Sequence, residues 1–103
     1  MSKSTRVVIL GNIITTVCAE WGVQYSDVCS TMSDGRGPIN LARNIVVYLA
    51  SPYAEMHELG ALLGRRQSTS LYTSRRNLMD KMERDDELAA RVGNLKIQLG
   101  LIS

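Results

Sequence analysis

The stretch "HELGALLGRRQSTSLYTSRR", His57 to Arg76, is the part of the sequence that decides the expected fold. Its first half has apolar residues at helical spacing and stops at Gly64, a good helix end because glycine takes a positive φ without a Cβ clash. A second helix is expected to begin near Ser68 or Thr69. The small residue Gly60 would let the two helices cross closely, so the stretch is typical of a helix-turn-helix.

Apolar residues keep a helical spacing on the N-terminal side of this motif as well. An opening helix is expected over about Val7–Trp21, ending near Gly22, although it could equally begin after Gly11. Ser26 is expected to cap a short second helix. Pro38 suits the first turn of a third helix.

The third helix should close at Ser51–Pro52, since proline biases its predecessor away from helical angles. Its expected core stripe is Leu41, Ile45, Tyr48 and Leu49. A last helix begins near Asp85, with acidic residues in a first turn where they favour the helix dipole. No stretch alternates like a strand. The sequence predicts one all-α domain over residues 1–103, a compact bundle of five to six helices with the helix-turn-helix at about 54–83 and a C-terminal helix at about 85–100.

Composition limits the other classes of function. The longest apolar run, Val7–Leu10, is far short of the roughly 20 residues of a spanning helix. With no secretion signal at the N-terminus, a cytoplasmic, nucleoid-associated protein is expected.

Cys18 and Cys29 are expected to be reduced thiols, with one disulfide as the alternative. A single histidine, His57, with no CxxC spacing and no nucleophile beside it, predicts no enzyme activity, no metal and no cofactor.

Charge is distributed unevenly although the net charge is only +2. Four arginines and no carboxylate lie between Ala61 and Met79, and acidic residues return at Asp80. Solvated helix faces usually mix both signs, because opposite charges one turn apart stabilise the helix. A one-sided segment therefore indicates a polyanionic partner, and in a helix-turn-helix that partner is double-stranded DNA.

The start of the second helix of such a motif enters the major groove. The residues expected to contact bases are Arg66, Gln67, Ser68 and Thr69. Arginine suits guanine, glutamine suits adenine, and hydroxyls suit several base edges. The residues expected on the DNA backbone are Arg65, Arg75, Arg76, Arg43 and Tyr72.

Three segments resemble a known family. "IITTVCAEWGVQYSDV", "ARNIVVYLA" and "HELGALLGRRQSTSLYTS" are similar to the C-terminal DNA-binding domain of the bacterial replication initiator DnaA, a helical domain related to the Trp-repressor fold. The resemblance implies that this chain is a DNA-reading module. The family's Asp-His-Thr-Thr readers are replaced here by Arg66 to Thr69, and its minor-groove arginine by Leu41, with Arg36 as a substitute. A DNA site different from the DnaA box is therefore expected.

Three functions remain open. The first is a sequence-specific DNA-binding regulator of transcription of cellular, phage or mobile-element genes. The second is a DNA binder associated with a replication origin, and the third is a helical assembly module whose basic face meets an acidic protein. The C-terminal helix, through Val92, Leu95 and Leu99, is expected either to form a homodimer or other protein contact or to pack against the first helix.

Overall fold

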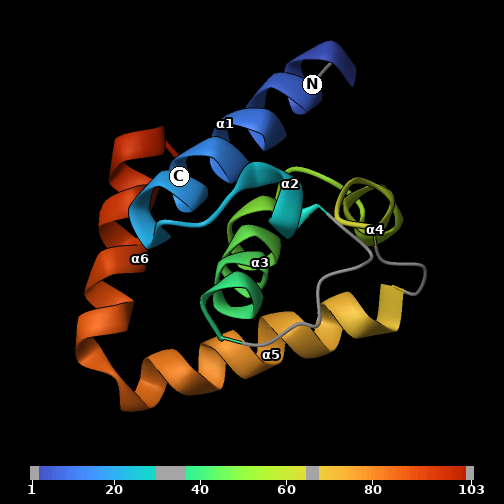
Figure 1. Cartoon of the computed structure of the whole chain (residues 1–103). Helices are drawn as coiled ribbons and strands as arrows, with labels where there is room; N and C mark the ends of the chain where they lie inside the picture. The colour runs from blue at the N-terminus through green and yellow to red at the C-terminus, as the bar shows by residue number, and fades with distance from the viewer. Residues whose placement is uncertain (1–2, 30–36, 65–67, 102–103) are drawn as a thin grey trace.

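Helix α3 (Gly37–Ala50) lies at the centre of the molecule, because its sequence is apolar on almost every side (Figure 1). The computed structural model describes residues 3–29, 37–64 and 68–101, with side chains for 5–29, 37–64 and 71–101. These residues form six helices and no strand. The other five are α1 (Lys3–Trp21), α2 (Tyr25–Val28), α4 (Met56–Leu62), α5 (Ser68–Arg84) and α6 (Asp86–Leu99).

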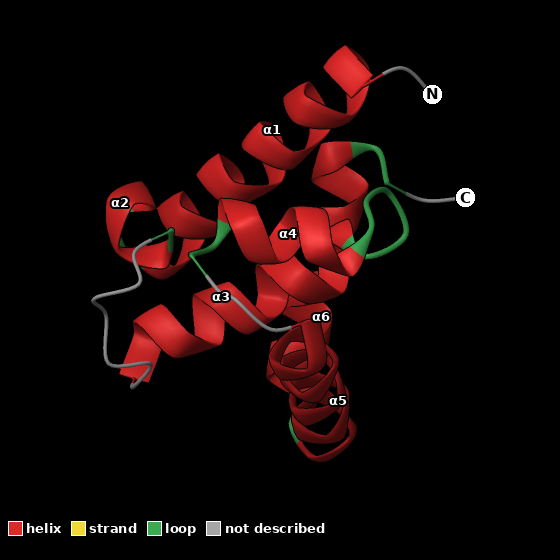
Figure 2. Ribbon diagram, turned by 90° about the vertical axis from the view of Figure 1, so that its right-hand side faces the viewer, coloured by secondary structure: helices red, strands yellow, loops and turns green. Residues whose placement is uncertain are grey.

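The other helices surround α3. Helix α1 packs on one side of it and α5 on another, while α6 contacts both α1 and α5 and so closes the bundle. Helix α4 sits against α5, and the two views in Figures 1 and 2 agree that α5 runs along an outer edge of the molecule. The radius of gyration, 12.6 Å, is that of a compact domain of this length. The expected all-α bundle is confirmed at this level.

Core residues come from every helix, and leucine, isoleucine and valine supply most of them. Ile45 and Leu49 of the expected α3 stripe are buried, whereas Leu41 and Tyr48 are half-buried. The unbroken run Ala42–Val47 is buried instead, because α3 is covered by neighbours on more than one side. Burying such a helix on all sides removes the single-stripe pattern on which the sequence prediction relied.

Most predicted helix ends lie within two or three residues of the observed ones. Helix α5 begins at Ser68, and α6 is capped by Asp85, whose carboxylate accepts a hydrogen bond from the Leu88 N–H at 3.0 Å. Of the two starts left open for the first helix, the longer one is confirmed, because α1 runs through Gly11. One expectation was wrong: Ser26 lies inside α2, which Gln24 precedes without a side-chain cap.

Polar contacts join elements that are distant in sequence. Arg6 of α1 pairs with Glu58 of α4 at 3.1 Å. Arg91 of α6 pairs with Glu20 of α1 at 3.2 Å and lies 4.4 Å from the ring centre of Trp21. These half-exposed contacts link α4 and α6 to α1.

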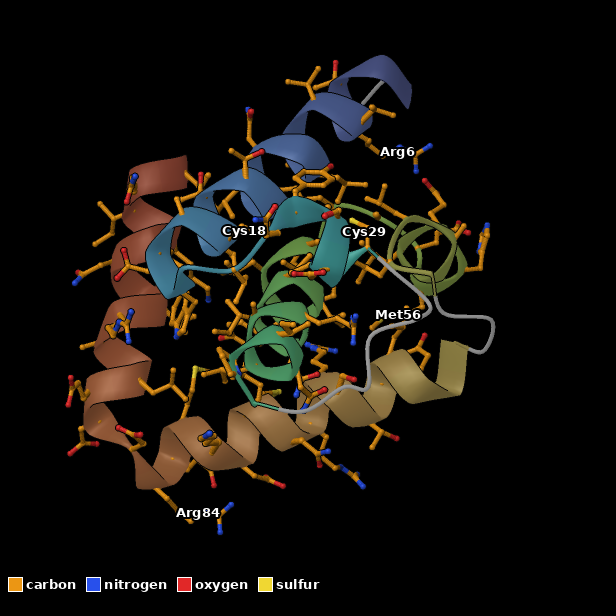
Figure 3. The ribbon with its side chains drawn as sticks, in the orientation of Figure 1. Arg6, Cys18, Cys29, Met56 and Arg84 are labelled. Carbon is orange, nitrogen blue, oxygen red and sulfur yellow. The ribbon has the colours of Figure 1, made fainter. Side chains whose placement is uncertain are left out.

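Cys18 and Cys29 are free thiols, which agrees with the expected reduced state (Figure 3). Burial raises the pKa of the Cys18 thiol above its ordinary value of 9.0, and neighbouring Cys29 raises it further. Burial also raises the pKa of Cys29, although the Arg43 guanidinium opposes that shift. Both thiols therefore act as small apolar groups. No helix among the described residues is both long and apolar enough to cross a bilayer.

Candidate nucleic-acid interface

The connection between α4 and α5 sets the direction of the basic helix. Helix α4 ends with Leu63 at its C-cap, and Gly64 follows with a φ of 70°. This left-handed conformation costs a non-glycine residue about 1–2 kcal/mol, which explains why glycine occupies the position. Gly60, which the sequence placed at the helix contact, is buried. A short helix, a left-handed glycine and a longer helix thus follow one another as predicted.

Helix α5 has one buried side and one broad exposed side. Leu71 and Leu78 are each 1% exposed and face the core, because seven residues make about two helical turns. On the outer side lie Tyr72, which is 56% exposed, Thr73 and Arg76. No carboxylate precedes Asp80 in this helix. The outer side of the first three turns is therefore polar, and its only formal charges are positive.

Arg75 lies on the flank of α5 that faces the start of α4. With Tyr72 it lines an open hollow of about 600 Å³, whose other wall includes Ser51, Glu55 and His57. Arg75 is half-buried, and its Nε has no hydrogen-bond partner among the described residues. This buried Nε is thus unpaired within the described part of the fold, while the half-buried side chain lines the hollow.

The predicted base-contacting residues are only partly placed. Arg65, Arg66 and Gln67 lie outside the described residues, as does the predicted minor-groove residue Arg36. Ser68 and Thr69 form the first turn of α5, but their side chains are not described. The helix that should carry base contacts is in place, and the contacts themselves stay a prediction.

Arg43 does not belong to the exposed basic surface. It is 1% exposed, and its Nε and one Nη donate hydrogen bonds to the main-chain carbonyls of Val28 and Asp27, both at 3.0 Å. A guanidinium covered in this way cannot reach a DNA phosphate, so the expected backbone contact of Arg43 is corrected. It instead holds the end of α2 against α3. The apolar run that follows Arg43 in α3 was the sequence signal for burial.

The apolar side of α6 that was expected to form either a dimer contact or a contact with the first helix faces the core. Val92 and Leu95 are each 2% exposed and pack in the core, and Leu99 is half-buried against it. These buried side chains cannot form the expected dimer surface, so the alternative, packing against the first helix, is the correct one, and α6 contacts α5 as well. Ile97, at 63% exposed, is the apolar side chain of α6 that faces outward.

The only histidine lies at the start of α4, in an ionic cluster. The side-chain ligand atoms of Glu55, His57 and Glu58 all lie within 4.8 Å of one another, a separation at which they could hold a cation. However, Glu58 is paired with Arg6, and His57 Nδ1 lies 3.1 Å from a Glu55 oxygen with both side chains about 70% exposed. The Arg6–Glu58 ion pair and a solvent-exposed contact between His57 and Glu55 account for this arrangement without a metal.

Comparison with known proteins assigns no family. No protein-family model matches the chain, and no curated protein sequence matches it. The chain is a small, compact, all-helical domain.

Proposed function

We propose that this protein binds double-stranded DNA through α5. The observation that carries the proposal is the outer side of the first three turns of α5, where Tyr72, Thr73 and Arg76 are exposed and no carboxylate occurs before Asp80. An ordinary surface helix has no reason to exclude acidic residues over this length. A helix that lies in a DNA groove does, because each carboxylate would face a wall of phosphates.

The division of roles follows from position along α5. The first turn is exposed to base edges when such a helix enters the major groove, and Arg66, Gln67, Ser68 and Thr69 supply the side chains for direct readout. Further along the helix, Arg75, Arg76 and Tyr72 are the proposed contacts to the DNA backbone, together with Arg65. Backbone contacts position the protein but carry no sequence information directly. Arg36 is the proposed minor-groove residue.

The resemblance to the DNA-binding domain of DnaA supports the same surface. Helix α3 contains the similar "ARNIVVYLA" segment, and α4 and α5 contain the similar helix-turn-helix segment. We propose a regulator of transcription that reads a site other than the DnaA box. A role at a replication origin would use the same surface, and the genomic position of the bound site distinguishes the two. One such helix covers about one half-site, so repeated half-sites are expected.

Selection from a random duplex library, followed by sequencing of the bound DNA, tests the proposal. We expect one enriched motif, and an affinity for it that falls log-linearly with salt concentration. Gln67→Ala or Ser68→Ala should relax the sequence preference with a modest loss of non-specific binding. Arg75→Ala should weaken binding to all duplexes similarly. If no motif is enriched and salt has no effect on binding, the helical assembly module with an acidic protein partner takes precedence.

A further inference from the structure

The hollow that Arg75 lines is formed where the start of α4 meets the first half of α5. It has a volume of about 600 Å³, and α5 contributes Tyr72 and Arg75 to its wall. His57 of α4 and Glu55, which precedes that helix, line it from the other element, together with Met56, which Figure 3 labels between α4 and α5. Among the described residues around the hollow, the ionisable groups are thus one guanidinium, one imidazole, one phenol and one carboxylate.

Arg75 lacks the acceptor that the fold gives to comparable arginines. It is half-buried, and it makes no hydrogen bond or ion pair with any residue that the structure describes. The other arginines of the described chain that are buried or half-buried each have an acceptor: Arg6, Arg43 and Arg91. The Nε of Arg75 is covered by the fold, whereas its two Nη groups are not fully covered. An anion in the hollow would supply the acceptor that a partly desolvated guanidinium requires.

His57 lines the same hollow with one ring nitrogen unused. Its Nδ1 lies 3.1 Å from a Glu55 oxygen, and its side chain is 71% exposed. Its Nε2 has no partner among the described residues. In a protonated histidine both ring nitrogens are donors. Nε2 is therefore a second donor for a ligand in the hollow, on a different helix from Arg75.

The charges around His57 make the net charge of the hollow depend on pH. Glu58 of the same helix is paired with Arg6 of α1, so the charge of each offsets the other. Glu55 and Arg75 line the hollow with opposite charges, and the phenol of α5 is neutral. When His57 is neutral, the hollow carries no net charge. When His57 is protonated, the hollow carries one positive charge, which attracts an anion.

We propose that this hollow binds one phosphate group between Arg75 and His57, and that protonation of His57 strengthens the binding. An Nη of Arg75 and Nε2 of His57 donate hydrogen bonds to the phosphate oxygens, and such bonds between charged groups are strong. The Tyr72 hydroxyl supplies a further donor. A phosphodiester of DNA and a free oxyanion offer the same chemistry to these donors. Only the DNA source rests on the proposed function, in which α4 and α5 would then hold the same strand.

Duplex binding measured at about pH 6 and at about pH 8 tests the role of His57, since histidine changes its charge in this range. His57 is the only histidine of the chain, so the change belongs to one residue. At about 0.1 M salt, we expect binding up to about eightfold tighter at the lower pH, and a slope of log K against log salt that is steeper by about one. His57→Gln should remove both differences. Its side chain is exposed, so this variant should fold.

A matched pair of glutamate variants tests the opposing charge. Glu55→Gln removes the carboxylate that lines the hollow, and it should tighten duplex binding severalfold at the higher pH. Glu87→Gln makes the same change in the first turn of α6, outside the hollow, and should bind like the native protein. Equal gains for the two variants would mean that net charge controls binding, and the phosphate site would be overturned.

Inorganic sulfate is the probe for a free oxyanion, because its charge is constant over this pH range. The signal to follow by NMR is the ring Cε1–H of His57, with Arg75→Gln as the variant that should abolish its response. If sulfate shifts this signal in the native protein alone and no duplex binds, the site stands and the proposed function is wrong. If only duplex DNA shows the His57-dependent pH effect, the phosphate comes from DNA. If duplex DNA binds equally at both pH values, or His57→Gln keeps the difference, the site is overturned and the proposed function stands. If neither sulfate nor DNA binds, both are overturned.

Discussion

Arginine has opposite roles in two regions of the molecule. One region is the contact between α2 and α3, and the other is the outer side of α5. At the first, Arg43 is 1% exposed and donates to two main-chain carbonyls at the end of α2. At the second, Arg76 is exposed on a helix whose first three turns lack carboxylates. The same side chain stabilises the fold in one region and is free to bind a partner in the other. Charge in a sequence therefore indicates a partner only where the tertiary structure leaves that charge at the surface.

The largest expected effect lies in the buried region. Arg43→Met should lower the free energy of unfolding by about 3 kcal/mol, because it leaves the carbonyls of Val28 and Asp27 without their donor. Chemical denaturation measures the loss. Arg43→Lys keeps the charge but loses the forked geometry, so it should be intermediate. A variant Arg43→Met as stable as the native protein, but with weakened DNA binding, would restore the phosphate role and remove the contrast between the two regions.

A smaller effect is expected on the exposed side, and there on binding rather than stability. Arg76→Gln should weaken binding to every duplex about eightfold at about 0.1 M salt, the loss expected for one phosphate contact. Fluorescence anisotropy over a series of salt concentrations measures this change. The matched variant Arg84→Gln lies at the other end of α5, where acidic and basic residues mix, and should bind like the native protein. Equal losses for both variants would mean that net charge, and not the outer side of α5, controls binding.

A pair of glycine substitutions tests whether Gly64 sets the direction of α5, and neither substitution changes the charge of that helix. Gly64→Ala should destabilise the protein by about 1 kcal/mol, because Gly64 has a φ of 70° at the turn before α5. Gly93→Ala should stabilise it by about 0.5–1 kcal/mol, because Gly93 is inside α6 and a Cβ there meets nothing within 4 Å. Thermal unfolding measures both. If Gly64→Ala is neutral, the glycine does not fix the angle between α4 and α5.

The smallest expected effect is a loss of stability in alkali that belongs to the buried region alone. The pKa of Cys18 is raised by burial and then by Cys29, so the folded state favours the neutral thiol. Stability from a raised pKa is complete below the unfolded-state value, 9.0, and falls as pH rises through the folded-state value.

Cys18→Val removes this ionisation while keeping an apolar side chain of similar size. As the pH rises above 9.0, the variant should lose less stability than the native protein. Cys29, whose pKa burial also raises, remains in both proteins and so acts as an internal control. Equal losses in the two proteins would show that Cys18 ionisation does not contribute.

Much of the local structure could be predicted from the sequence because its signals are local. Gly64 and Asp85 mark helix boundaries by their own conformational and capping preferences, and both are found where expected. Ser26 shows the limit of such a signal. It is a good capping residue, but the N-cap position of α2 is Gln24, two residues earlier, and this short helix packs on α1 and α3.

The sequence by itself determined the helices, their order and the acid-free stretch of α5, since each depends on residues a few positions apart. Only the tertiary structure decided which polar residues stay available. It buries Arg43 at α2, directs Val92 and Leu95 into the core, and places His57 and Arg75 at one hollow. The physical reason is that exposure and hydrogen-bond partners depend on which helices meet, and residues far apart in the chain, such as His57 and Arg75, acquire a shared environment only when they pack.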